Sequence, residues 1–286
     1  MTIRPHHPLD PDLPSLRDLG DDLLGVTPLR RLITLSAPFL WMAAYFVFAG
    51  RHWWPLAVAS VMGLTFVSYG STSHDLVHRA LDLPARLNNL LLTVIELLSF
   101  RSGTAYRLSH LHHHRRLLGP DDIEGAAAHG SLIRAVASGP SLQLRIWLWA
   151  WRTHPRERTV LLCEAVSIGA LTIGAVCAMR HSPAPLIYAG LVVAGSWTIP
   201  VITVYLPHDV HGATPLERTR MFRGRFVRLV AFDHLYHLEH HLYPSVPHHH
   251  WKALADRLDP HFERAGVRAY GADRHGSCGA MSHAAN

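Results

Sequence analysis

The histidines of this sequence recur at spacings that suit metal binding. His74 and His78 stand four residues apart in HDLVH, and a helix would place both imidazoles on one face. The segments HLHHH and HLEHH each place histidines at i, i+3 and i+4, again on one helical face. Neutral imidazole is the commonest side-chain ligand of transition metals, so these patterns predict metal ligands. With one histidine from YLPHDVH added, the predicted ligands are His74, His78, His110, His113, His114, His208, His237, His240 and His241.

This ligand set is too large for one ion. A structural zinc takes about four protein ligands and a catalytic zinc about three, so nine imidazoles predict two metal ions. Spacing does not choose among iron, copper and zinc, because imidazole suits all three. The sequence contains no HExxH and no Glu-x-x-His, which excludes a zinc-protease helix and a carboxylate-rich four-helix di-iron site. No catalytic residue beyond the ligands is predicted.

Further polar residues near the clusters are candidates to support the ligands. Metal-bound histidines usually donate their second ring N–H to a carboxylate or a carbonyl. By contrast, His112 would point off the ligand face, so we expect it to lie outside the metal site. The predicted supporting residues are Asp75, Asp121, Asp122, Asp209, Asp233, Glu239, His211 and His234.

Hydrophobic segments must position these clusters. Of the 286 residues, 49% are hydrophobic and only 17% are charged, against roughly 25% charged in a soluble domain. Stretches of about 20 apolar residues cross a bilayer core about 30 Å thick. Four stretches reach that length: residues 32–50, 53–73, 159–179 and 183–207.

Two other segments are apolar without being predicted to span. As a helix, residues 87–100 would be only about 21 Å long, and they contain Glu96, so we expect them to be buried or re-entrant. Residues 131–152 mix tryptophans with arginines, which predicts an interfacial segment, interrupted at Gly139-Pro140.

Charge predicts the orientation. Only Arg51 and Arg180 fall in the short turns of the two hairpins, and the remaining Lys and Arg residues, of 27 in all, fall on the opposite side. By the positive-inside rule that side is cytoplasmic. An even number of crossings separates the histidine clusters, so we expect all of them, and both termini, on the cytoplasmic face.

The predicted fold is therefore an all-α membrane protein. It has about four transmembrane helices in two hairpins, with a cytoplasmic helical cap that holds the histidine-rich di-metal site. We expect a polar cytosolic segment at 1–31, a membrane domain at 32–258 and a flexible tail at 259–286.

Composition excludes several other classes of protein. There are three cysteines and no CxxC pair, which argues against a disulfide scaffold and against thiol-bound zinc or redox sites. The net charge of +6 in so apolar a chain fits a membrane-surface bias better than nucleic-acid binding, and we expect no nucleic-acid partner.

The order HxxxH, HxxHH, HxxHH around two membrane hairpins resembles the membrane fatty acid desaturase superfamily. This superfamily includes acyl-lipid desaturases, carotenoid ketolases and related hydroxylases. The likeness covers about residues 32–258 and is most specific at DHLYHLEHHLYPSVP, residues 233–247. HDLVH with Pro84 and Asn88 resembles the first histidine box, SHLHHHRRLLGPDD resembles the second, and His208 matches the additional ligand before the third.

The resemblance implies two iron ions, with O2 as co-substrate. It implies an oxidoreductase that introduces a double bond or a hydroxyl into a lipid acyl chain in the bilayer. Two electrons must come from an external donor such as ferredoxin, because the sequence has no flavin, haem or iron–sulfur motif.

Two alternatives stay open at the level of sequence. VYLPH at 204–208 resembles carotenoid ketolases, which would make the substrate an isoprenoid and the reaction ring ketolation or hydroxylation. A non-catalytic histidine-rich metal transporter or sensor is more remote, since transport favours polar residues in mid-membrane and the predicted spans have almost none.

Overall fold

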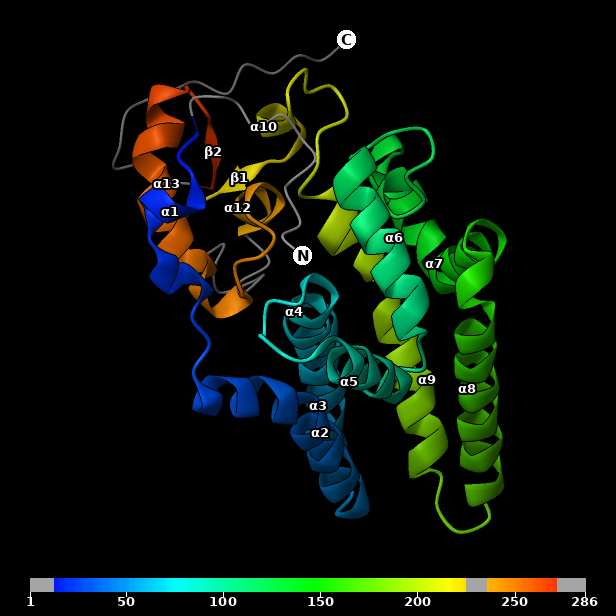
Figure 1. Ribbon diagram of the computed structural model, residues 1–286. Coiled ribbons are helices and arrows are strands. Elements are labelled where there is room, and N and C mark those ends of the chain that lie inside the picture. The colour runs from blue at the N-terminus through cyan, green and yellow to red at the C-terminus, as the bar shows by residue number, and fades with distance from the viewer. Residues whose placement is uncertain (1–12, 225–235, 272–286) are drawn as a thin grey trace.

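The protein is helical throughout most of its length. The computed structural model describes residues 13–224 and 236–271 (Figure 1). Within these ranges the only strands are β1 (Met221–Phe222) and β2 (Ala269–Tyr270), which pair in parallel. The predicted all-α class is therefore confirmed.

Four long apolar helical segments form two hairpins. Among the described residues, the segments long and apolar enough to cross a membrane are Asp21–Gly50, Trp54–His78, Pro155–Ala178 and Ala184–Tyr205. These correspond to the four predicted spans. Both hairpin turns lie at one end of the molecule, while α6, α12 and α13 lie toward the other (Figure 1).

Several of these segments are built from consecutive helical pieces. The second consists of α3 (Trp54–Val67), the π-helical turn η2 (Ser68–Thr72) and α4 (Ser73–His78). The fourth consists of α9 (Ala184–Ser196) and the π-helical turn η5 (Pro200–Tyr205). The first and third hold α2 (Pro28–Gly50) and α8 (Arg158–Ala178).

Shorter helices surround the spans and build the cap. Three of them lie between the hairpins: α5 (Ala85–Leu98), α6 (Gly103–Arg116) and α7 (Leu132–Thr153). The remaining α-helices are α1 (Leu16–Leu19), α10 (Pro215–Arg218), α12 (His237–Leu242) and α13 (Trp251–Arg264). The 3-10 turns are η1 (Asp21–Leu24), η3 (Gly125–His129), η4 (Pro155–Glu157) and η7 (His248–His250).

One prediction for the interfacial segment is wrong. Gly139-Pro140 does not interrupt it, because α7 runs continuously with Pro140 inside the helix. The glycine serves helix packing instead, since a Cβ at Gly139 would collide with the backbone of Trp197 at the end of α9. The small residue thus permits close approach of α7 to the fourth span.

Helix α5 is mostly apolar but contains one buried carboxylate. Glu96 is fully buried and accepts a hydrogen bond from Nε of Arg101 at 2.8 Å. Arg101 is itself 3% exposed, and its guanidinium lies over the ring of Tyr69. A buried carboxylate is tolerated when it is paired in this way, so the charge ties α5 to the start of α6.

The cap, formed by α1, η1, α10, α12, η7 and α13, encloses its own apolar core. The N-terminal elements α1 and η1 contribute residues to this core. Leu19 and Leu23 pack with α13 residues that include Leu254 and Phe262. Two hydrogen bonds of 2.8 and 2.7 Å join Arg257 to Asp22. Residues 13–24 are thus part of the cap, and the tail boundary predicted at residue 258 falls inside α13.

A second buried carboxylate anchors α6. Glu164 of α8 is 2% exposed and accepts hydrogen bonds from the hydroxyls of Thr93, Ser102 and Thr104. It also accepts the backbone N–H of Thr104 at 3.1 Å, within the first turn of α6. A carboxylate is favoured at a helix N-terminus, where backbone N–H groups are unpaired. Glu164 therefore fixes where α6 begins relative to the third span.

We predict that Glu164→Ala lowers the free energy of unfolding by about 2–4 kcal/mol, because it leaves several buried donors unpaired. Unfolding in detergent micelles measures the change. Ser167→Ala is the matched control on the same helix, since its hydroxyl donates to the carbonyl of Cys163, one turn earlier in the helix. Equal stability of the two variants would contradict this role of Glu164.

Candidate metal centre

The structure gathers the nine predicted ligands into two adjacent groups. The five-histidine group is His74, His78, His110, His114 and His240. The four-histidine group is His113, His208, His237 and His241. Within each group the candidate ligand nitrogens all lie within 4.8 Å of one another. His112 lies outside both groups, 3.2 Å from Asp121 and against the ring of Trp149.

Each HxxHH segment divides its histidines between the two groups. On α6, His110 and His114 belong to the five-histidine group and His113 to the other. On α12 the division is reversed, with only His240 in the five-histidine group. At about 100° per residue, positions i+3 and i+4 fall on opposite sides of position i. One helix can therefore serve two neighbouring ions.

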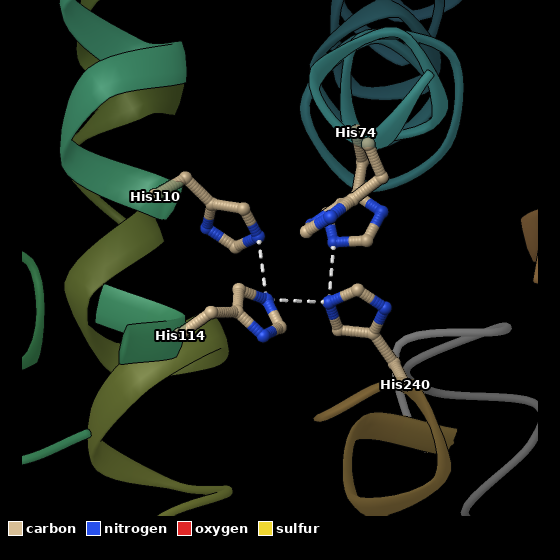
Figure 2. A group of neighbouring side chains, drawn as sticks. His74, His110, His114 and His240 are labelled. Carbon is tan, nitrogen blue, oxygen red and sulfur yellow. Dashed lines mark hydrogen bonds between the residues drawn. The ribbon is translucent and has the colours of Figure 1, made fainter. Parts of the chain in front are cut away.

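The Nε2 atoms of four members of the five-histidine group face one another. His240 Nε2 lies 3.0 Å from that of His74 and 2.8 Å from that of His114 (Figure 2). His114 Nε2 lies 3.2 Å from that of His110. Nitrogens bound at right angles to one metal, each about 2.1 Å away, are about 3 Å apart. The arrangement fits a shared ion.

The four-histidine group has the same internal spacing. Its Nε2 atoms lie 3.0 Å apart for His237 and His241, and 3.3 Å apart for His208 with each of these two. The rings of His114 and His241 stack at 4.4 Å and join the two groups. Two ions bound here would be close neighbours.

Burial disfavours the charged form of several of these imidazoles. Burial, reinforced by neighbouring imidazoles, lowers the pKa of His114, His240 and His241 well below the usual value, and that of His208 to about 3. The Nε2 atom of His78 is buried and has no hydrogen-bond partner among the residues that the structure describes. Neutral nitrogens without carboxylates suit a transition metal rather than magnesium or calcium.

Two buried carboxylates orient ligands from the segment that follows α6. His110 donates its Nδ1–H to Glu124 at 2.9 Å, and His113 donates its Nδ1–H to Asp122 at 2.7 Å. Burial opposes ionisation, yet the hydrogen bond and charge of His113 lower the pKa of Asp122 to about 2. The charge of His110 likewise lowers the pKa of Glu124. Both pairs leave Nε2 free to face a metal.

Asp122 is the predicted supporting residue whose carboxylate holds one of the nine histidines. Four others have different partners. Asp75 binds His248, Asp121 pairs with His112 and Arg116, Asp209 lies 3.6 Å from Arg220, and Glu239 pairs with Arg223. His211 is exposed and donates its backbone N–H to Asp209. Asp233 and His234 lie outside the described residues.

Glu124 is a site residue that sequence reasoning missed. It also accepts hydrogen bonds from the hydroxyls of Tyr69 and Ser109, both at 3.3 Å. The feature that could have pointed to it is an acidic residue two positions after Asp122, in GPDDIEG. The sequence does not show that the loop turns back along α6, so its proximity to His110 was hidden.

Two π-helical turns lead directly into ligands. The turn η2 ends two residues before His74, and η5 ends three residues before His208. Such turns are frequent at functional sites. His208 then donates Nδ1–H to the carbonyl of Val204 at 2.9 Å, which leaves its Nε2 for the four-histidine group.

Comparison with known proteins agrees with this geometry. A family model described as fatty acid desaturase matches residues 51–271, which is most of the chain. A search of the curated proteins finds no match.

We predict that Glu124→Ala and Asp122→Ala each weaken metal binding about 10–100-fold, because each frees a ligand imidazole to rotate. Competition with a chelator, followed by metal analysis of the purified protein, measures the affinity. Asp121→Ala is the control, because its carboxylate is half-exposed and holds neither His110 nor His113. Equal weakening in all three variants would contradict the assignment.

Proposed function

This chain belongs to the fatty acid desaturase family, and from that membership we propose an integral membrane oxidoreductase acting on lipid acyl chains. It introduces a double bond or a hydroxyl. The reaction uses O2 and two electrons from an external donor such as ferredoxin. Two iron ions are the proposed cofactors, held by the five-histidine and four-histidine groups.

The observation that carries the proposal is the pair of all-imidazole groups at the ends of apolar spans. When bound, iron would supply the redox chemistry needed to break an unactivated C–H bond, which zinc lacks. The proposed ligands among the described residues are all histidines, so the centre would carry little fixed negative charge of its own. Asp122 and Glu124 add that charge through His113 and His110.

Protein side chains shield the centre from water. Trp251 is 3% exposed, and its ring lies 5.2 Å from those of both His74 and His240. Tyr106 covers His110 at 5.5 Å and stacks on Tyr69 at 4.5 Å. Exclusion of water suits a site that oxidises an alkyl chain.

An apolar recess between two spans supports a lipid substrate. It is shallow and open on one side, and its exposed lining is mostly apolar. Its threonine hydroxyls donate to carbonyls of their own helices, so the threonines present methyl groups. At one side stands Tyr69, which contacts Glu124 and through it His110. The lining residues are Thr65, Phe66, Tyr69, Thr198, Ile199, Ile202 and Thr203.

We place the histidine groups and both termini on the cytoplasmic side. The support is the scarcity of Lys and Arg in the two hairpin turns, which hold only Arg51 and Arg180. An electron donor would then meet the arginine-rich face of the cap.

Expression of the chain in a lipid-producing host and in a carotenoid-producing host tests the substrate class. We expect new unsaturated or hydroxylated acyl chains by mass spectrometry in the first host and unchanged pigments in the second. New keto- or hydroxycarotenoids with unchanged lipids would overturn the proposal in favour of a carotenoid ketolase or hydroxylase. Purified protein with zinc and no iron would overturn the oxidoreductase assignment.

We predict that His240→Ala abolishes product while the protein stays in the membrane, because His240 faces both His74 and His114. His112→Ala should keep most of the activity, since His112 lies outside both groups. Product yield relative to protein level in isolated membranes provides the measurement. Full activity in His240→Ala would show that His240 is not an essential ligand.

A further inference from the structure

A third cluster of metal-binding side chains lies outside the nine histidines. It consists of Asp75, His248 and His249, whose candidate ligand atoms all lie within 4.8 Å of one another. Asp75 comes from α4, while both histidines come from η7, more than 170 positions later in the chain. The residues therefore meet only through tertiary structure.

Asp75 holds η7 against α4. Its carboxylate is almost fully buried and accepts the backbone N–H of His248 at 2.9 Å. The same carboxylate accepts Nδ1–H of His248 at 2.6 Å. Asp75 follows His74 directly, yet it binds this segment rather than one of the nine histidines. The carboxylate and the first imidazole of the cluster are thus already fixed in place.

His249 supplies a third donor. Its Nδ1 atom is buried and has no hydrogen-bond partner among the described residues. Burial lowers the pKa of His249 to about 4, so its imidazole is neutral at physiological pH. The next residue differs, because His250 donates its Nδ1–H to the carbonyl of Leu23 at 2.9 Å. Of these two neighbouring imidazoles, only His249 has an uncommitted Nδ1.

We propose that Asp75, His248 and His249 form an accessory site for a divalent transition metal, with zinc as the best-fitting ion. Two imidazoles and one carboxylate are a normal zinc ligand set, with water in the fourth position. Tetrahedral ligands of zinc lie about 3.4 Å apart, so the Asp75 and His248 atoms, now 2.6 Å apart, would separate slightly on binding. The ion would take the place of the proton between Asp75 and His248.

The position of the site gives it a structural consequence. The segment with His248 follows the third histidine cluster by seven residues, and Asp75 lies within the first cluster. An ion bound between them would tie η7 to α4 beside Trp251, which packs on His74 and His240. Binding should therefore raise the melting temperature. The proposal does not depend on the reaction that the enzyme catalyses.

The test uses full-length protein in detergent, stripped of metal and then saturated with zinc alone. After removal of free zinc, elemental analysis gives the number of bound equivalents. We expect one equivalent more in the wild type than in His249→Ala, and at least a tenfold weaker affinity for that last equivalent in His249→Gln. The last equivalent should also raise the melting temperature of the wild type.

His250→Ala is the matched control and should bind as many equivalents as the wild type. The metal held by the nine histidines should be the same in all variants. Equal zinc in the wild type and His249→Ala would overturn the proposal and leave Asp75 and His248 as a hydrogen-bonded clamp only. Loss of the same equivalent in His250→Ala would also overturn it.

Discussion

The constraint on which this structure depends is the convergence of nine imidazoles in a buried space. Nitrogen atoms about 3 Å apart, such as those of His114 and His240, cannot all satisfy one another by hydrogen bonds, because each neutral ring has one donor and one acceptor. Metal ions placed between the lone pairs would resolve this conflict. The helices α4, α6 and α12 must then be placed so that their histidine rings meet.

Buried carboxylates hold α6 in the position that this requirement sets. Glu164 fixes the first turn of α6 within the membrane-spanning part, and Glu96 with Arg101 fixes the turn that precedes it. At the other end of α6, Glu124 and Asp122 orient the imidazoles themselves. The helix that carries the second histidine cluster is therefore held by acidic side chains at both ends. A charge that is costly in an apolar setting is used where backbone N–H groups or histidine N–H groups can pair with it.

The cap completes the centre from the opposite side. Its core joins the N-terminal residues to α13, so that α12 is supported on a folded layer rather than on a loop. Asp75 links this layer to α4 through His248, and Trp251 fills the space between the link and the ligands. The first and third histidine clusters, which are far apart in sequence, thus pack against the same side chain, Trp251. The recess between the second and fourth spans is lined by Tyr69, whose hydroxyl donates to Glu124 beside His110.

The sequence by itself determined which residues gather and which segments span. Helical periodicity places His110, His113 and His114 on one face, and segment length and polarity define the four spans, because both properties are local. Only the tertiary structure decided how nine histidines divide into five and four, since that depends on how α4, α6 and α12 are rotated about their axes. It also decided which carboxylate serves which imidazole. Glu124 binds His110, and Asp75 binds His248. The spacing of these residues in the sequence does not predict either pair, because packing brings the partners together.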